Sequence, residues 1–236
     1  MQILYFLYPK QAYKREGIAF FIAVLFHGFG LWGMLNNMSF FINNTPTNLI
    51  VSFLLILYTH RKVNINFISF VVFAVGFGFI VEYVGVNTGL LFGSYKYGEV
   101  LGTKIGGVPL TIGLQWMVTI YCCCMVFAFL QRFALKKLAE KGIVKENKLY
   151  NFTFLFDTAF LAVFFDWVME PVAQKLGFWF WLPNGEIPSY NYFCWFICAI
   201  PIIWCFKWCK VFEFNKFAIH LLMIQIMFFL VLRTFL

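Results

Sequence analysis

Long apolar blocks recur along this sequence, and each is about as long as a helix that crosses a lipid bilayer. A spanning helix needs about 20 mostly apolar residues. Hydrophobic residues make up 62% of the 236 residues and charged residues only 12%, whereas soluble proteins carry about 25% charged residues. We therefore expect an all-α, polytopic integral membrane bundle. This composition excludes a disordered chain, a secreted disulfide scaffold and a nucleic-acid-binding domain.

The apolar blocks predict about seven transmembrane helices. The second has the weakest signal, because Asn43, Asn44, Pro46 and Asn48 crowd its start. Seven spans use most of the chain, so we expect residues 1–236 to form a single membrane-embedded domain. The predicted spans are 17–36, 38–59, 64–83, 108–131, 150–169, 190–206 and 216–235.

The basic residues predict the orientation, because lysine and arginine accumulate on the cytoplasmic side of short loops. With the N-terminus inside, fourteen of the 18 basic residues fall in inner segments. The net charge of +8 is then mainly a signal of topology. The inner residues are Lys10, Lys14, Arg15, Arg61, Lys62, Arg132, Lys136, Lys137, Lys141, Lys145, Lys148, Lys207, Lys210 and Lys216. The outer residues are Lys96, Lys104, Lys175 and Arg233.

The cysteines are typical of packing residues rather than of metal ligands. Cys122, Cys123 and Cys124 are consecutive and point in three directions from a helix. A second set, at 194, 198, 205 and 209, follows one helical stripe. A zinc site would use two closely spaced pairs on a loop, usually with histidine, and the three histidines are scattered. We expect no metal site.

The segment 82–109 separates two predicted spans and is rich in glycine and aromatic residues. Its glycines are interleaved with Phe92, Tyr95 and Tyr97. We interpret it as too rich in glycine for a stable helix and too apolar for a solvated loop. It should form a folded lid or a re-entrant segment on the outer face, with glycines at turns and close backbone contacts.

Three acidic residues, Asp157, Asp166 and Glu170, stand in the otherwise apolar fifth span, which we expect to end at Pro171. Intramembrane carboxyl groups face the bundle interior or a cavity. Asp166 and Glu170 are four residues apart and share a helix face. Two carboxyl groups this close in a poorly solvated place resist simultaneous ionisation. Aromatic residues surround them in the sequence, namely Trp167, Trp179, Trp181, Tyr190, Tyr192 and Trp195.

Each of these signals also has a plainer interpretation. Tryptophans near span ends commonly form an interfacial belt, and an acid at a span end, such as Glu82 or Glu170, can simply reach water. Asp157 can bond a neighbouring helix. Convergence favours a functional site, because Glu82, Asp166, Glu170 and the segment 82–109 all fall on the outer half of the predicted bundle.

The segment 81–195, about half of the chain, resembles the carotenoid biosynthesis family of CruF-type carotenoid 1,2-hydratases. The resemblance rests on E-x-x-G-V-x-T-G-x-x-F-G-x-Y-x-Y from Glu82, followed by G-V-P-L and Trp116, and later on D-x-x-x-E-P-V-A, W-x-W and I-P-x-x-N-Y. It implies an enzyme that works without a cofactor in the bacterial inner (cytoplasmic) membrane. Such an enzyme adds water to the acyclic end-group alkene of lycopene, gamma-carotene or a related carotenoid.

The implied chemistry agrees with the residues. Hydration of an isolated alkene begins with protonation, which leaves a tertiary cation, and a carboxyl group kept neutral in a dry site can supply the proton. Asp166 and Glu170 form the expected catalytic pair, with Asp166 favoured as the acid, and Glu82 is the third candidate. Aromatic faces stabilise a cation. The expected substrate-binding residues are Tyr95, Tyr97, Phe92, Trp116, Trp167, Trp179, Trp181 and Asn191.

Two other functions stay open at this point. A lycopene-type cyclase begins with the same protonation but quenches the cation with an internal alkene, so its product is an isomer. A non-catalytic carotenoid-binding membrane protein needs the aromatic cleft but not the acids. The expected partners are the carotenoid, membrane lipid and other enzymes of carotenoid biosynthesis, and no nucleic acid.

Overall fold

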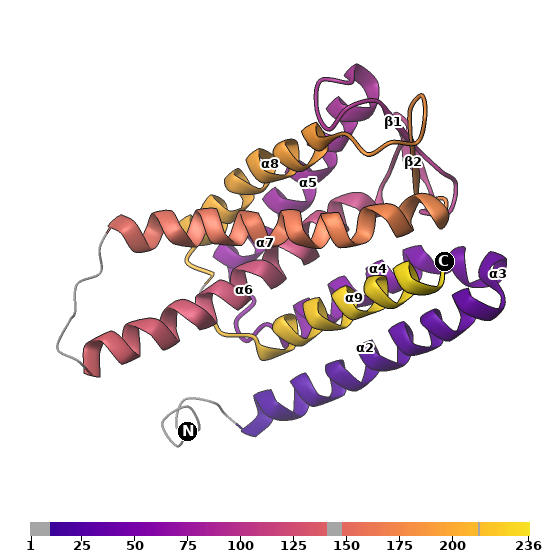
Figure 1. The fold of residues 1–236 in the computed structure, drawn as a ribbon. Helices are drawn as coiled ribbons and strands as arrows, with labels where there is room; N and C mark the ends of the chain where they lie inside the picture. Colours follow the sequence, from indigo (N-terminus) through magenta and orange to yellow (C-terminus); the bar gives the residue numbers. More distant parts are fainter. Residues whose placement is uncertain (1–9, 141–147, 212) are drawn as a thin grey trace.

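The computed structural model describes residues 10–140, 148–211 and 213–236, and it confirms a polytopic helical membrane fold (Figure 1). The helices are α2 (Lys10–Asn36), α3 (Met38–Ile42), α4 (Thr45–Thr59), α5 (Ile65–Thr88), α6 (Thr111–Glu140), α7 (Lys148–Lys175), α8 (Ser189–Trp208) and α9 (Lys216–Phe235). Short strands are β1 (Tyr95–Tyr97), β2 (Lys104–Ile105), β3 (Val108–Pro109) and β4 (Trp179–Trp181). β2 pairs with β3, and β1 pairs with β4.

Within the described residues, six helices (α2 and α5 to α9) are long and apolar enough to cross a membrane. The second predicted span, 38–59, is divided into α3 and α4. The amides of Asn43 and Asn44 donate to the carbonyls of Ser39 and Phe40, and α4 restarts with a proline in its first turn. With 15 residues, α4 is about 22 Å long, so a full seventh crossing stays a prediction.

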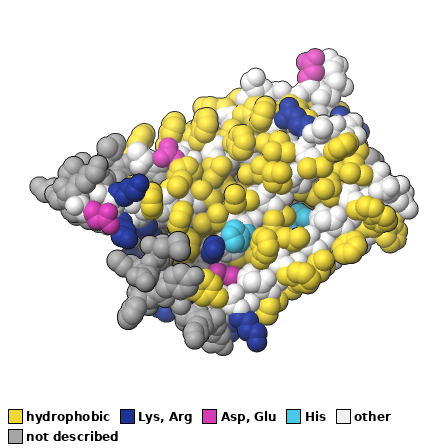
Figure 2. Space-filling model, turned by 60° about the horizontal axis from the view of Figure 1, so that its bottom comes forward, with side chains coloured by type: hydrophobic (Ala, Val, Ile, Leu, Met, Phe, Trp, Pro, Cys, Tyr) yellow, Lys and Arg dark blue, Asp and Glu magenta, His cyan; other side chains and the backbone are white. Residues whose placement is uncertain are grey.

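Helix α6 lies at the centre of the bundle and packs against α4, α5, α7, α8 and α9. Cys122, Cys123 and Cys124 are fully buried, because neighbouring helices surround this part of α6. Large apolar side chains on the outer helices are exposed instead, as Phe21 and Phe160 are at 63% and 62%. Figure 2 shows hydrophobic side chains over most of one face of the molecule, as expected for a surface in contact with lipid.

Two glycines allow α5 and α6 to approach closely. A Cβ atom on Gly78 would lie 2.4 Å from the Cβ of Trp116, and one on Gly113 would lie 2.5 Å from the carbonyl oxygen of Val75. A side chain at either position would therefore push the two helices apart. The close approach places Trp116 against Gly78 of α5, and Gly78 lies one helical turn before Glu82.

The strands gather at one end of the bundle, where α9 also ends, while α2 begins at the opposite end (Figure 1). Two predicted helix ends were wrong. Helix α5 continues to Thr88 instead of ending near 83, so Glu82 lies inside it. Helix α7 continues past Pro171 to Lys175, because a proline in a helix removes one backbone hydrogen bond and need not end it. Lys141 and Lys145, used for the predicted orientation, lie outside the described residues.

Candidate active site

Strands β1 and β4 form a two-stranded antiparallel ribbon that carries four aromatic side chains on its inner face. Tyr95 pairs with Trp181, and Tyr97 pairs with Trp179. Side chains alternate along a strand, so the four pairing residues are buried while Lys96 is exposed and Phe180 is 40% exposed. We call β1 and β4 the aromatic ribbon.

One strand of the aromatic ribbon binds Glu82 on α5. The hydroxyl groups of Tyr95 and Tyr97 donate to Glu82 Oε2 at 2.5 and 2.7 Å. Trp116 Nε1 donates to Glu82 Oε1 at 2.9 Å. Burial, and then the nearby Glu82 carboxylate, raise the pKa of Tyr95 and of Tyr97 well above the ordinary value, so both hydroxyl groups keep their protons and remain donors.

The other strand binds Glu170 on α7 in the same manner. Trp179 Nε1 and Trp181 Nε1 donate to Glu170 Oε2 at 3.0 and 2.9 Å. The Asn191 amide on α8 donates to Glu170 Oε1 at 3.1 Å and to Asp166 Oδ2 at 2.9 Å. Asn191 therefore joins the two carboxyl groups that the sequence placed on one helix face.

The hydrogen bonds divide the three carboxyl groups into two kinds. Glu82 and Glu170 each accept three bonds, and an ionised carboxyl group is an acceptor only. Asp166 accepts one bond, and its Oδ1 is buried with no hydrogen-bond partner in the described part of the chain. Asp166 is thus the carboxyl group whose surroundings suit a protonated form, since few donors compete with its own proton.

The three carboxyl groups line one small cavity of about 30 Å³. A cavity of this size can hold about one or two water molecules when polar groups line it. Its walls bring together residues from α5, α6, α7, α8 and both strands of the aromatic ribbon. The lining residues are Glu82, Phe92, Tyr95, Tyr97, Ile112, Gln115, Trp116, Asp166, Met169, Glu170, Trp179, Trp181, Asn191 and Trp195.

All the sequence-predicted site residues except Trp167 line this cavity. Trp167 follows Asp166 directly and therefore projects about 100° away around the helix. It is 46% exposed and stacks on Phe164 and under the Arg233 guanidinium, so the prediction that it lines the site was wrong. Asp157 does not line the cavity either.

Sequence reasoning missed Gln115 as a site residue. It is buried beside Trp116 and donates to the Thr119 hydroxyl at 3.3 Å. A single amide within an apolar helix was the available signal. Trp195, noted among the nearby aromatic residues, stacks on Trp116 with ring centroids 3.9 Å apart, so two indole rings form one wall of the cavity.

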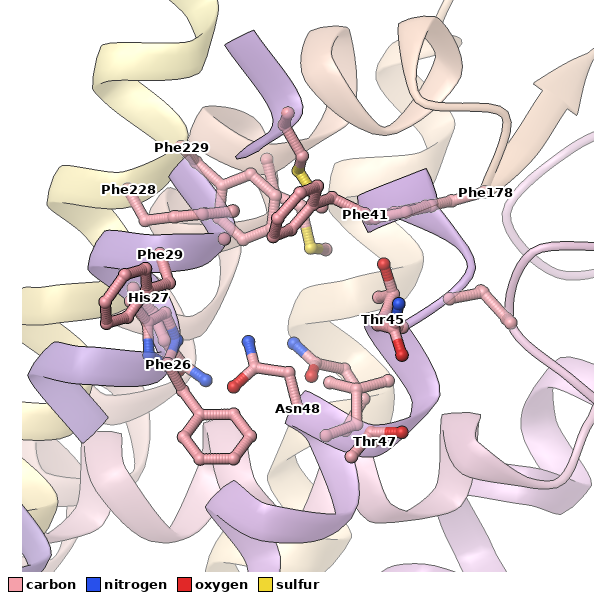
Figure 3. A pocket seen from close by; sticks show the side chains of 18 of the residues that line it. Phe26, His27, Phe29, Phe41, Thr45, Thr47, Asn48, Phe178, Phe228 and Phe229 are labelled. Atoms are coloured by element: carbon pink, nitrogen blue, oxygen red, sulfur yellow. The ribbon is translucent and has the colours of Figure 1, made fainter. Parts of the chain in front are cut away.

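A much larger cavity of about 530 Å³ adjoins the small one. Ile112, Gln115, Met169 and Trp179 line both cavities. Seven phenylalanines from α2, α3, α9 and the chain before β4 line the large cavity, and Figure 3 shows Phe41, Phe228 and Phe229 along one side of it. An elongated apolar molecule fits such walls.

Among the described residues, no group of three or more His, Cys, Asp or Glu side chains is arranged to hold a metal ion. The carboxyl groups are instead bonded by tyrosine, tryptophan and asparagine. The site therefore consists of protein acids, hydrogen-bond donors and aromatic faces.

Fold and site together define a helical membrane protein with buried acids beside a large apolar cavity. Comparison with known families then gives the particular family. The model of the carotenoid biosynthesis protein family matches residues 44–236, and the chain belongs to this family. Neither the curated proteins nor the solved structures contain a match to it. The family assignment supports a role in carotenoid biosynthesis.

Proposed function

We propose that this protein is a carotenoid 1,2-hydratase. It adds water to the acyclic end-group alkene of lycopene, gamma-carotene or a related carotenoid. Asp166 and Glu170 are the proposed catalytic pair, and no cofactor takes part. The observation that carries the proposal is the small cavity, where Asp166, whose Oδ1 has no partner in the described part of the chain, stands beside two carboxyl groups that each accept three hydrogen bonds.

The first step transfers the Asp166 proton to the less substituted alkene carbon. The π electrons form the new C–H bond, and the positive charge develops on the tertiary carbon. The stacked indole rings of Trp116 and Trp195 offer their faces to this charge, and cations are attracted to such faces. The carboxylate that the transfer leaves on Asp166 adds negative charge beside it.

In the second step a water molecule in the small cavity adds its oxygen to the tertiary carbon and gives a proton to Glu170. The product is a tertiary alcohol. Asn191 contacts both acids, so water in the same cavity can return the proton from Glu170 to Asp166. Glu82 keeps three donors in place and thereby orders the aromatic ribbon.

The large cavity supplies the remaining requirement, a place for the polyene. Its phenylalanine-rich walls adjoin the small cavity through four shared residues. An acyclic end can therefore reach the acids while the rest of the molecule lies among apolar side chains. Membrane lipid surrounds the helices, and carotenoids dissolve in it.

The test is the pigment profile of a lycopene-producing host with and without this chain. We expect a more polar pigment that is heavier by one water molecule. An isomer of unchanged mass would instead identify a cyclase. An unchanged profile, with the protein present in the membrane, would favour a non-catalytic carotenoid-binding protein.

A further inference from the structure

Three buried amide oxygens that have no partner in the described part of the chain lie around the large cavity, although its walls are mainly apolar. The residues that carry these oxygens line the cavity from different helices. They are Asn48 on α4, Gln115 on α6 and Gln225 on α9. An unpaired buried polar atom costs free energy, so their placement in a single cavity calls for a ligand.

The missing partner is a hydrogen-bond donor. The unpaired atoms are Asn48 Oδ1, Gln115 Oε1 and Gln225 Oε1, and amide oxygens are acceptors. His27 adds to this pattern. Its Nδ1 lies 2.8 Å from the Ala23 carbonyl oxygen, and because a carbonyl only accepts, Nδ1 donates and Nε2 of the neutral ring is an acceptor.

The geometry points to a binding site for an isoprenoid that carries a hydroxyl group. We infer that the phenylalanine side chains hold the hydrocarbon, while the hydroxyl group donates its one hydrogen bond to one of the amide oxygens of Asn48, Gln115 and Gln225. Water bound to the hydroxyl oxygen links it to the other two amides. Figure 3 shows His27 and Asn48 turned toward the same space, bordered by Phe228 and Phe229. The isoprenoid part of the ligand rests on the proposed function.

A hydroxyl group fits better than water alone. Water would satisfy the amides, but it would leave seven phenylalanine rings around about 530 Å³ without an apolar partner. A plain hydrocarbon would satisfy the rings and leave the amide oxygens unpaired. A molecule with both parts places hydrocarbon among the rings and a donor among the amide oxygens. Gln115 lines both cavities, so the hydroxyl group lies near the chain end that reaches the acids.

Three probes test this inference on the purified, full-length protein in detergent. They are an acyclic C20 isoprenoid alcohol, its methyl ether and the hydrocarbon without oxygen. Quenching of tryptophan fluorescence reports binding, since Trp179 lines the cavity. The alcohol should bind about tenfold or more tightly than the other two, because only the alcohol donates a hydrogen bond to the unpaired oxygens. Equal affinities would mean that the amides hold water only and would overturn the inference.

Two substitutions locate the site. Gln225→Met and Gln115→Met keep the side-chain length and remove the amide, and each should reduce the preference for the alcohol over the ether several-fold. Met223→Leu on α9 is the matched control, because Met223 is 60% exposed on the outer surface and should leave the preference unchanged. An unaltered preference in both glutamine variants would overturn the inference. If a variant fails to fold, the comparison of the three probes on the unmodified protein still decides.

These binding ratios separate the inference from the proposed function. If the protein prefers the alcohol but forms no hydrated pigment, the binding site is supported and the proposed hydratase function is not. If the protein hydrates carotenoids but binds all three probes equally, the proposed function is supported and the binding site is not.

Discussion

At the scale of single residues, the acids of the site differ in their hydrogen bonds rather than in their depth. Glu82, Asp166 and Glu170 are all buried, with at most 5% of each residue exposed. The two glutamates each accept three hydrogen bonds, whereas Asp166 Oδ1 has no partner in the described part of the chain. A carboxyl group that must give up a proton needs this kind of surroundings, and one that must receive a proton benefits from fixed donors that hold its orientation.

The first prediction concerns this pair. Asp166→Asn and Glu170→Gln keep shape and remove proton transfer, so each should lower turnover by about 10²–10⁴-fold, the usual contribution of a general acid or base. The measurement is the hydration rate of purified variants. Asp157→Asn, on the same helix but outside the cavity, should retain activity. Full activity in both amide variants would remove the pair from the mechanism.

The second prediction concerns His60, which caps the end of α4 far from the acids in sequence. His60 Nδ1 lies 2.8 Å from the Tyr121 hydroxyl oxygen, and its ring stacks on Phe67. Burial lowers the pKa of His60 from 6.5 to about 4. In the unfolded chain His60 therefore becomes protonated below about pH 6.5, whereas in the folded protein it becomes protonated only below about pH 4. The contribution of neutral His60 to the free energy of unfolding is therefore full above pH 6.5. It decreases as the pH falls from 6.5 to 4.

The loss from His60 can reach about 3 kcal/mol at pH 4, at about 1.4 kcal/mol for each pH unit of pKa difference. Thermal unfolding in detergent at pH 7 and pH 5 measures it. His60→Gln removes the titrating group, so its melting temperature should fall less between the two pH values than that of the unmodified protein. Equal falls would show that His60 does not carry the effect.

The residue types of the site could be predicted from sequence, but not all their directions. Helical spacing placed Asp166 and Glu170 on one face, and the structure has both in one cavity. Trp167 was assigned by its nearness to Asp166 in the chain, although consecutive helical residues project in different directions. Gln115 was overlooked because its meaning depends on packing between helices, which no spacing rule encodes.

At the scale of elements, the site depends on two close contacts, one between helices and one between strands. The Y-x-Y and W-x-W patterns agree with strands that have one buried face. Their pairing joins segments more than 80 residues apart, which the sequence alone did not predict. The end of α5 was mispredicted because Gly85 suggests a helix break. In the structure Gly85 lies within the helix and leaves space for the Tyr95 side chain, since a Cβ atom on Gly85 would lie 2.8 Å from the Tyr95 hydroxyl oxygen.

The third prediction tests the contact between α5 and α6. Gly78→Ala puts a methyl group against the Cβ atom and indole ring of Trp116, and such overpacking costs about 1–3 kcal/mol. The melting temperature should fall, and hydration should fall with it because Trp116 moves relative to Glu82. Gly76→Ala on the same helix is the control, because no atom lies within 4 Å of its added methyl group. Comparable losses in both variants would contradict a specific contact at Gly78.

The fourth prediction tests the aromatic ribbon. Tyr95→Phe and Tyr97→Phe together remove both donors to Glu82 Oε2. A buried polar group left without partners costs about 1–3 kcal/mol, so the double variant should melt at a lower temperature and hydrate more slowly. Lys96→Ala changes the exposed residue between them and should do neither. A double variant with the melting temperature and hydration rate of the unmodified protein would show that the two hydroxyl groups do not hold Glu82 in place.

At the scale of the whole molecule, the proposed function requires a fold that lies in lipid and encloses a small polar cavity at one end of an apolar core. The outer helices present phenylalanines to the surroundings, so an apolar substrate needs no aqueous step to reach the protein. The carboxyl cluster lies inside the bundle, and the large cavity beside it extends to exposed phenylalanines of α2 and α3. Composition and hydropathy were enough to predict this arrangement in outline, because lipid requires its backbone groups to be bonded within helices.

The fifth prediction is the orientation, for which the predicted N-terminus is cytoplasmic and the C-terminus external. Among the described residues, the six long helices and α4 make seven candidate passes through the bundle. Helix α2 begins at the end opposite to that where α9 ends (Figure 1). An odd number of passes places the two ends of the described chain on opposite sides. The excess of lysine and arginine in the segments at the α2 start then assigns that side to the cytoplasm.

A reporter fused after Phe235 should therefore report an external location, and one fused in the link between α6 and α7 a cytoplasmic one. The aromatic ribbon and the acids would then face the external half of the membrane. Helix α4 is the element on which this depends, because its 15 residues fall short of the about 20 of a spanning helix. If both reporters gave the opposite locations, α4 would not cross the membrane, because it precedes both fusion sites in the chain. Reporters at Asn44 and Lys62 would then lie on the same side.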